Sequence, residues 1–318
     1  MIPILWASFL AVAIGLSIWI SFAHWKRKAL VQLESGANLV NTSRGPIECA
    51  VLGEGPAVLI SHGVMGGYDQ GLAVIASGFF GDSAYRFIAL SRPGYLRTLP
   101  EVGRTPEEQA DSFAALLDSL RIEKVVVAGI SGGGPPSLQF ALRHSDRCEA
   151  LLLISAVTER LPQQKTGKFA LLLRAILLAD FPAWLALGLA SRVPSLGFRA
   201  ILSSQELQKI RAPKILKNLL RVTDSTAPIS VRRIGVMIDG QYLTTLPAYR
   251  LGLISVPTLV IHGTSDNVVP FASSERTATA IPGARLLAVE NGSHFACLLG
   301  RSDVSSQVQK FLQEVLSR

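Results

Sequence analysis

Two hydrophobic patterns divide the chain, and the first is an apolar run at its N-terminus. Ile2–Ala23 carries no ionisable side chain. At about 1.5 Å per residue this run predicts a helix of roughly 33 Å, which is long enough to cross a bilayer. Lys26, Arg27 and Lys28 follow it directly, and cations on that side predict that the rest of the chain stays in the cytoplasm. We therefore predict a single-pass membrane anchor with a basic flank over residues 1–28.

A cleaved signal peptide is the alternative interpretation of this segment. Ser21-Phe22-Ala23 has the small-x-small form of a cleavage site. However, no Lys or Arg precedes the apolar run, and the run is longer than a signal peptide requires. Both features favour an anchor that is retained.

The second pattern alternates short apolar runs with longer amphipathic ones, which is typical of a mostly parallel, doubly wound sheet covered by helices. Thr105 and Glu108 form a capping-box pattern at the start of a helix that runs to about Leu120. Helical spacing of apolar residues predicts a further helix over Asp303–Leu316. The predicted strands are Ile47–Leu52, Ala57–Ser61, Arg86–Ser91, Lys124–Gly129, Ala150–Ser155, Thr258–His262 and Arg285–Val289.

The alternation stops between residues 157 and 255. Leu-rich, Arg-rich helical sequence with several prolines replaces it there. We interpret this segment as a helical cap inserted into one α/β domain, whose two parts are residues 45–156 and 256–318. No internal repeat or low-complexity linker separates the cap from that domain, so we expect the cap to pack on the sheet.

The positive charge of the chain is concentrated in the same segment. The net charge is +8, and Lys and Arg outnumber Asp and Glu by 14 to 5 between residues 157 and 255. No nucleic-acid motif accompanies these cations and aromatic residues are sparse among them, so we predict no nucleic-acid partner. Attraction of a basic cap to anionic lipid is one explanation, and cations on solvated helix faces are the other.

The three cysteines argue against a disulfide framework. Cys49, Cys148 and Cys297 are scattered, and none stands at metal-ligand spacing from another Cys or a His. We predict that all three are reduced and buried, and that the protein uses neither a metal nor a cofactor.

A candidate nucleophile stands between a predicted strand and the helix that follows it. Gly129-Ile130-Ser131-Gly132-Gly133 is a Gly-x-Ser-x-Gly motif in that position. Small residues on both sides let the strand pack closely on the helix, and the tight turn then exposes the hydroxyl of Ser131 at the sheet edge. A phosphate-binding loop is the alternative, but the Lys-Ser/Thr pair that such a loop requires is absent.

A serine hydroxyl is a weak nucleophile and needs a base, for which five histidines compete. His24 lies beside the membrane run, and His144 lies about three turns down the helix that follows the serine. His62 and His262 end predicted strands. His294 lies in a turn-rich loop after the last strand, which opens onto the same sheet edge, so we predict that it is the base.

The base needs an acid to orient it. Asp266 stands a few residues past the predicted strand Thr258–His262, and the order Ser, Asp, His along the chain favours it. Glu159, just past an earlier strand, is the rival acid. Three residues in three successive loops at one sheet edge are what a catalytic triad requires.

These motifs resemble those of the α/β-hydrolase family, in family order and over about residues 45–318. The motif around Ser131 resembles the nucleophile elbow, His62-Gly63 the oxyanion loop, and Ser91–Tyr95 the loop after the fourth strand. The resemblance implies that the backbone N–H groups of Val64 and Gly132 form the oxyanion hole, and that residues 157–255 cap the pocket.

The resemblance also restricts the type of reaction that we expect. Family members that dehalogenate or open epoxides carry Asp as nucleophile, whereas Ser131 implies acyl transfer to water. We expect a carboxylic-ester hydrolase that acts on small apolar acyl substrates. Thioester, lactone or carbon–carbon bond hydrolysis, peracid formation and a non-catalytic ligand-binding role remain alternatives.

Overall fold

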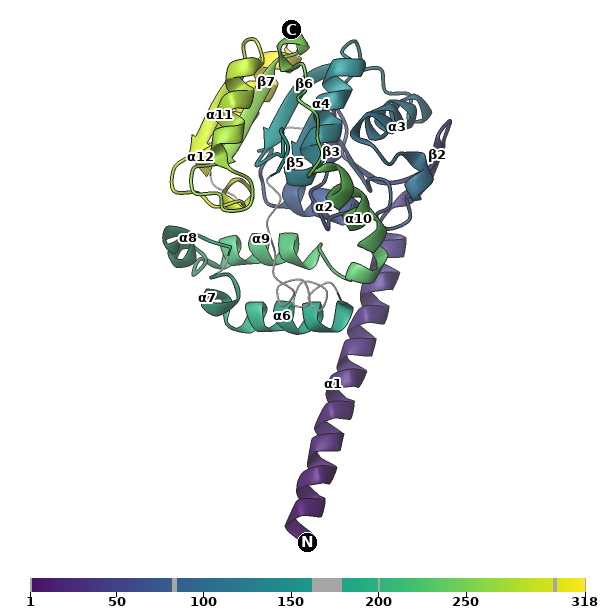
Figure 1. The fold of residues 1–318 in the computed structure, drawn as a ribbon, viewed down its shortest axis with the longest axis vertical. Coiled ribbons are helices and arrows are strands. Elements are labelled where there is room, and N and C mark those ends of the chain that lie inside the picture. The colour runs from purple at the N-terminus through teal and green to yellow at the C-terminus, as the bar shows by residue number, and fades with distance from the viewer. Residues whose placement is uncertain (1, 82–84, 162–178, 200, 300–301, 318) are drawn as a thin grey trace.

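The structure is a computed structural model that describes residues 2–81, 85–161, 179–199, 201–299 and 302–317 (Figure 1). One long helix, α1 (Ile2–Ser35), projects from a globular part built around a single sheet. Helices cover both faces of this sheet, and a further group of helices lies between it and the projecting end of α1.

The sheet has eight strands in the order β1-β2-β4-β3-β5-β6-β7-β8. β2 runs antiparallel to both of its neighbours, and all other pairs are parallel. The strands are β1 (Asn38–Thr42), β2 (Gly45–Leu52), β3 (Ala57–Ser61), β4 (Arg86–Leu90), β5 (Val125–Ile130), β6 (Cys148–Ile154), β7 (Thr258–Gly263) and β8 (Arg285–Val289). The mostly parallel α/β fold and seven of these strands are as predicted.

Strand β1 was missing from the prediction for a physical reason. It is an edge strand that pairs only with β2 among the described strands, and most of its side chains are exposed. Its sequence, Asn-Leu-Val-Asn-Thr, therefore lacks the apolar run that marks a buried strand.

Two apolar clusters, one on each face of the sheet, form the core. Residues of α2 (Tyr68–Ala76) and α12 (Ser302–Leu316) pack on one face. Residues of α3 (Pro106–Ser119), α4 (Gly134–Arg143) and α11 (Phe271–Ala280) pack on the other. The sheet is thus doubly wound, and the capping box of Thr105 and Glu108 is present at the start of α3.

In the described part of the chain, several helices lie between β6 and β7, where the insertion was predicted. They lie over the ends of the strands, between the sheet and the projecting part of α1 (Figure 1). Part of the predicted cap, residues 162–178, lies outside the described residues. The described helices are α6 (Asp180–Arg192), α7 (Pro194–Gly197), α8 (Ser204–Lys209), α9 (Pro213–Asp224) and α10 (Arg233–Tyr242), with the 3-10 turns η3 (Ile229–Val231) and η4 (Leu251–Leu253).

Helix α1 continues beyond the predicted apolar run and joins the globular part. The hydroxyl of Tyr68 donates a hydrogen bond to the carbonyl of Leu33, at 2.9 Å, in the last turns of α1. Over Ser8–Ser35 the helix is long and apolar enough to cross a membrane, a property that signal sequences share. Cys49, Cys148 and Cys297 are buried, as predicted, and in the described part of the chain they form no disulfide.

Candidate active site

The turn after β5 holds Ser131 in an uncommon backbone conformation. Ser131 has a φ of 49°, in the left-handed region that non-glycine residues rarely adopt. A Cβ at Gly129 would lie 2.6 Å from the Ser137 hydroxyl, and one at Gly133 would lie 2.2 Å from the Ser61 carbonyl oxygen. Both flanking glycines are therefore required by close packing of β5, β3 and α4, which holds the strained turn in place.

Three side chains from three loops meet at this turn. Nε2 of His294 lies 3.0 Å from Oγ of Ser131. Nδ1 of the same ring lies 2.7 Å from Oδ2 of Asp266. Because an ionised carboxylate can only accept, Nδ1–H donates to Asp266, and Nε2 is left to accept the proton of the Ser131 hydroxyl. His294 follows β8 and Asp266 follows β7, so parallel strands bring the three loops to one edge of the sheet.

Asp266 is held ionised by several donors. Its Oδ1 accepts the backbone N–H groups of Val268 and Val269 at 2.7 and 2.9 Å. Its Oδ2 lies 2.9 Å from Nε2 of His262, besides the bond from His294. Burial raises the pKa of Asp266, but the hydrogen bonds from the two histidines outweigh burial and hold the pKa well below its usual range. The carboxylate is therefore ionised at neutral pH.

His262 is a positioning residue that sequence reasoning missed. Its ring is fully buried behind Asp266, and its Nδ1 lies 2.6 Å from the hydroxyl of Ser274 on α11. Ser274 O–H can donate to Nδ1, which leaves Nε2–H to donate to Asp266. The sequence placed His262 at a strand end but gave no signal that its ring faces the acid.

His62 is buried and supports the loop after β3. Its Nε2 accepts the backbone N–H of Arg92 at 2.9 Å, and its Nδ1–H donates to the carbonyl of Gly63 at 2.7 Å. Burial, and then the charge of Arg92, lower the pKa of His62 well below its usual value. The imidazole of His62 is therefore neutral, both of its ring nitrogens form hydrogen bonds, and its role is structural.

The other candidate residues lie elsewhere. His144 bonds to Asp111 at 2.9 Å, and His24 is exposed on α1. Glu159, the rival acid, forms an ion pair with Arg276 at the surface and does not face His294.

The two predicted oxyanion donors lie close together beside Ser131. A Cβ at Gly132 would lie 3.2 Å from the backbone N of Val64. Gly132 is in the first turn of η2 (Ser131–Gly133), where N–H groups have no acceptor within the helix. Within the described part of the chain, the Val64 N–H has no acceptor either. Two free N–H groups next to a nucleophile can bind a developing oxyanion.

A buried charge network supports the loop that carries Val64. Both terminal guanidinium nitrogens of Arg92, in the loop after β4, donate to the carboxylate of Asp239 on α10, at 2.6 and 2.7 Å. The hydroxyls of Tyr95 and Tyr242 donate to the same carboxylate at 2.6 and 2.7 Å. The Tyr95 hydroxyl also accepts the N–H of Met65 at 3.3 Å. Through Arg92 and Tyr95, helix α10 is thus linked to the loop that carries Val64 and Met65, a link that the sequence did not indicate.

A cavity of about 300 Å³ opens from Ser131 between the core and the cap. The core side contributes apolar residues such as Ile130 and Ile154, and the cap side contributes Val222 and Leu243. Within the described residues no group of three or more His, Cys, Asp or Glu side chains is placed to hold a metal ion. The remaining lining is Gly63, Val64, Met65, Gln70, Ser155, Val157, Leu161, Ile201, Thr226, Val268, Val269, His294 and Phe295.

The fold agrees with comparisons to known proteins. Residues 56–301 match the alpha/beta hydrolase fold family, so the chain belongs to that family. An alpha/beta hydrolase fold protein from Nakamurella multipartita superposes with a TM-score of 0.77, at 31% identity over 88% of this chain and 98% of that one. An uncharacterised hydrolase of Bacillus subtilis, YcgS, is 28% identical over 80% of this chain and 90% of its own length.

A third comparison concerns the fold alone. An esterase from Thermogutta terrifontis superposes with a TM-score of 0.64 at 22% identity, covering 88% of this chain and 98% of that one. The protein is a member of a family of hydrolases, and the bond that it cleaves has to be argued from its own site.

Proposed function

We propose that this protein is a membrane-anchored serine hydrolase that cleaves carboxylic esters of apolar acyl groups. The observation that carries the proposal is the continuous contact from Ser131 through His294 to Asp266, at 3.0 and 2.7 Å. A serine, a base and an orienting acid in this geometry form an activated nucleophile.

The site supports the following reaction. Oγ of Ser131 attacks the acyl carbonyl carbon while Nε2 of His294 takes the hydroxyl proton, and the carbonyl oxygen becomes an oxyanion that accepts from Val64 and Gly132. The intermediate collapses, the carbon–oxygen bond of the ester breaks, and His294 returns the proton to the leaving alkoxide. A water molecule then attacks the acyl-enzyme, His294 takes its proton, and the acid leaves as Ser131 regains its hydrogen. Asp266 stays ionised and stabilises the imidazolium in both halves.

The cavity favours an apolar acyl group over other substrates on the same triad. Its lining is mostly aliphatic, so a neutral chain gains the free energy of leaving water. A charged chain would lose its hydration without finding a partner. Thioesters and lactones share the attacked carbonyl and are the nearest alternative substrates; carbon–carbon bond hydrolysis, peracid formation and ligand binding without catalysis are the others.

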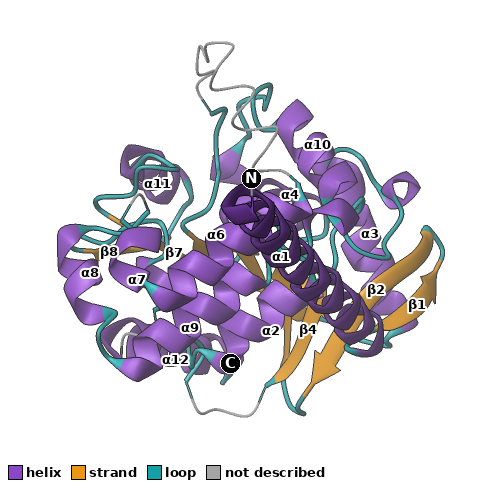
Figure 2. Cartoon of the chain, turned by 90° about the horizontal axis from the view of Figure 1, so that it is seen from below, coloured by secondary structure: helices purple, strands orange, loops and turns teal. Residues whose placement is uncertain are grey.

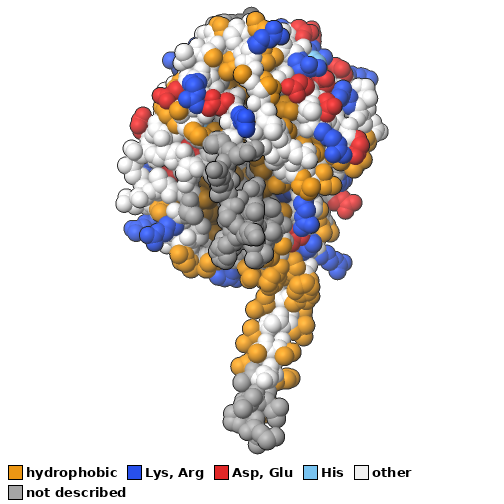
Figure 3. All heavy atoms as spheres, viewed as in Figure 1, with side chains coloured by type: hydrophobic (Ala, Val, Ile, Leu, Met, Phe, Trp, Pro, Cys, Tyr) orange, Lys and Arg blue, Asp and Glu red, His pale blue; other side chains and the backbone are white. Residues whose placement is uncertain are grey.

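The membrane part of the proposal rests on α1. Phe22, close to the possible cleavage site of a signal peptide, is buried against α6 of the cap, which supports retention of the segment. Lys26, Arg27 and Lys28 favour a cytoplasmic globular part. Lys and Arg side chains are spread over the visible face of the globular part, and anionic lipid would attract those that lie near α1 (Figure 3).

A series of acyl-chain lengths tests the substrate class. With the full chain in detergent micelles, we expect kcat/KM for p-nitrophenyl esters to rise about fourfold per added methylene until the cavity is full, which corresponds to about 0.8 kcal/mol each. The monosuccinate ester, whose acyl chain ends in a carboxylate, should react far more slowly than the butyrate ester. Equal rates for these two esters, or no turnover of any ester, would contradict the proposed substrate class.

A further inference from the structure

Among the described residues, helix α6 and the short helix α7 present an exposed apolar stripe. Leu185, Leu189, Val193 and Leu196 are spaced by four, four and three residues and are 47%, 48%, 42% and 58% exposed. Leu185 and Leu189 are one turn apart and so share one side of α6. Val193, where α6 ends with φ −129° and ψ 71°, and Leu196 on α7 extend the exposed apolar residues beyond that helix. Large apolar side chains gathered on one exposed surface mark a contact site in proteins of this size.

The segment is fixed to helix α1 by specific contacts. Nζ of Lys26 lies 2.7 Å from the carboxylate of Asp180, the first residue of α6. One turn further into the apolar run, Phe22 meets the ring of Phe181 edge-on at 5.2 Å and the ring of Trp184 at 5.7 Å. Both views show α6 crossing α1 at the base of the globular part (Figures 1 and 2). The position of α1 in a bilayer therefore sets the position of α6.

The contacts fall at the level where a bilayer would end. If the charge-free run of α1 fills the roughly 30 Å hydrocarbon layer, its boundary lies near Ala23. A cavity between the two helices is bounded by Ser17 on α1 and by Leu185 and Leu189 on α6. Ser17 lies about 9 Å along the helix axis inside Ala23, at 1.5 Å per residue. Helices that lie in a membrane interface bury their apolar side by about 5–10 Å, the same depth.

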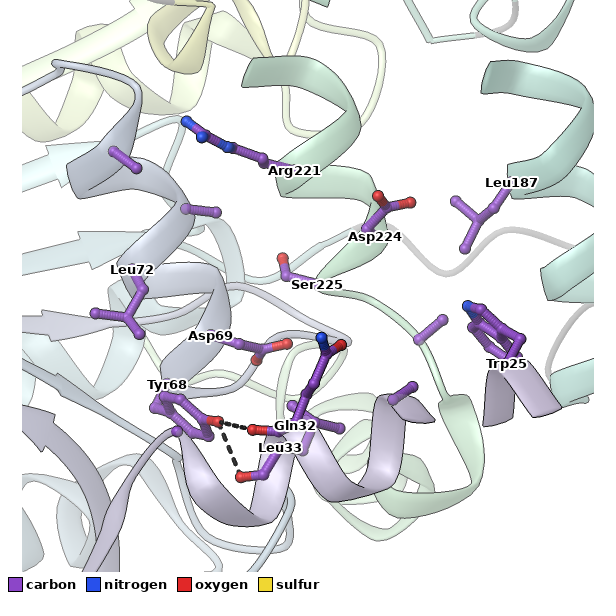
Figure 4. Close-up of a pocket in the computed structure, with 15 residues that line it drawn as sticks. Trp25, Gln32, Leu33, Tyr68, Asp69, Leu72, Leu187, Arg221, Asp224 and Ser225 are labelled. Atoms are coloured by element: carbon purple, nitrogen blue, oxygen red, sulfur yellow. Dashed lines mark hydrogen bonds between the residues drawn. The ribbon is translucent and has the colours of Figure 1, made fainter. Parts of the chain in front are cut away.

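The residues beside α1 change from apolar to polar near the level of Ala23, where the hydrocarbon layer would end. Trp19, Trp25 and Trp184 cluster where α1 meets α6, and tryptophan is enriched at the membrane–water boundary. Beyond Trp25 a crevice of about 620 Å³ opens between α1, α2 and α9, and its walls include the polar side chains of Gln32 and Asp224 (Figure 4). Water or lipid headgroups suit this crevice, whereas acyl chains suit the stripe.

We propose that α6 and α7 lie in the interface of the same bilayer that α1 crosses, with the stripe Leu185–Leu196 in contact with lipid acyl chains. We assign the bilayer as the partner of the stripe because the stripe continues the apolar surface of α1 at the depth where the hydrocarbon layer would end. The inference rests on α1 spanning a membrane and is independent of the chemistry at Ser131. The same inserted segment reaches the cavity at Ser131, because Ile201 and Val222, which follow these helices in the chain, line that cavity.

Fluorescence quenching measures the depth directly. The full chain carrying Leu189→Cys is labelled with the environment-sensitive dye NBD and reconstituted in phosphatidylcholine vesicles; the three native cysteines are buried, which directs the label to the new thiol. Leu185→Cys provides an independent second position. Leu99→Cys is the matched control, because Leu99 is 58% exposed on the globular part, in the loop before η1 (Pro100–Val102).

At the depth inferred for α6, we expect blue-shifted emission at both positions and at least about twofold quenching by lipids with a nitroxide at carbon 5, with neither effect at the control. If the emission at all three positions matches that of the dye in water, the proposal is wrong. A blue shift at positions 185 and 189 that nitroxide lipids do not quench would also overturn it, since a protein partner or a second copy would then cover the stripe. Neither readout depends on ester hydrolysis, so loss of the proposed activity would leave this test intact.

Discussion

Replacing Ser131 with alanine is expected to lower kcat for ester hydrolysis by at least about a thousandfold. The substitution removes the Oγ atom proposed to form the acyl-enzyme, while the cavity and the two backbone donors remain. KM should change much less, because the apolar lining that binds the acyl group is untouched. The measurement is steady-state turnover of p-nitrophenyl butyrate by the full chain in micelles.

A second serine provides the matched control for this experiment. Ser112 on α3 is also buried, and its hydroxyl donates to the backbone carbonyl of Gln109 at 2.7 Å, within its own helix. Ser112→Ala removes a buried hydroxyl without touching the proposed chemistry, so it should keep most of the activity. Equal activity in the Ser131→Ala variant and the unmutated chain would contradict the assignment of Ser131.

Replacing Arg92 with methionine is expected to destabilise the protein by about 3–5 kcal/mol, because it leaves the buried carboxylate of Asp239 without its ion-pair partner. Arg92 is fully buried and holds that carboxylate with two bonds. The expected result is a lower midpoint of urea denaturation with an unchanged slope. Activity should also fall in the folded fraction, since the same network supports the loop that carries Val64.

Two further variants distinguish the loss of stability caused by the unpaired buried charge from the loss caused by weaker packing. Adding Asp239→Leu to the Arg92→Met chain removes the stranded carboxylate and should recover part of the stability. Arg276→Met breaks the exposed ion pair with Glu159 and should leave the midpoint unchanged. A midpoint for Arg92→Met that equals that of Arg276→Met would contradict a structural role for the buried network.

The sequence predicted the parts of the fold that depend on local pattern. Strands β3 and β8 have the predicted bounds because each contains an apolar run flanked by turns, in the buried strand β3 and in the half-exposed edge strand β8 alike. The start of α3 is as predicted because a capping box is a local motif. The exposed edge strand β1 carries neither signal and was missed.

The site shows the same division. The turn at Ser131 could be predicted because its motif consists of adjacent residues. The parallel strands bring the loops of Asp266 and His294 beside this turn, and the three side chains are in contact. His262 and Asp239 were missed because their roles depend on which way one ring and one carboxylate point inside the core. Nothing in helical spacing distinguishes Asp239 from a solvated acid on the outer side of α10.

Covalent labelling tests the central claim, an activated serine at position 131, most directly. A fluorophosphonate is attacked by a serine whose proton a base removes and is inert toward ordinary hydroxyls. After reaction of the native full chain with the probe and digestion, we predict an adduct on the peptide that contains Ser131 and none after heat denaturation or in the Ser131→Ala variant. An unlabelled native chain, or an adduct on a different serine, would contradict the account.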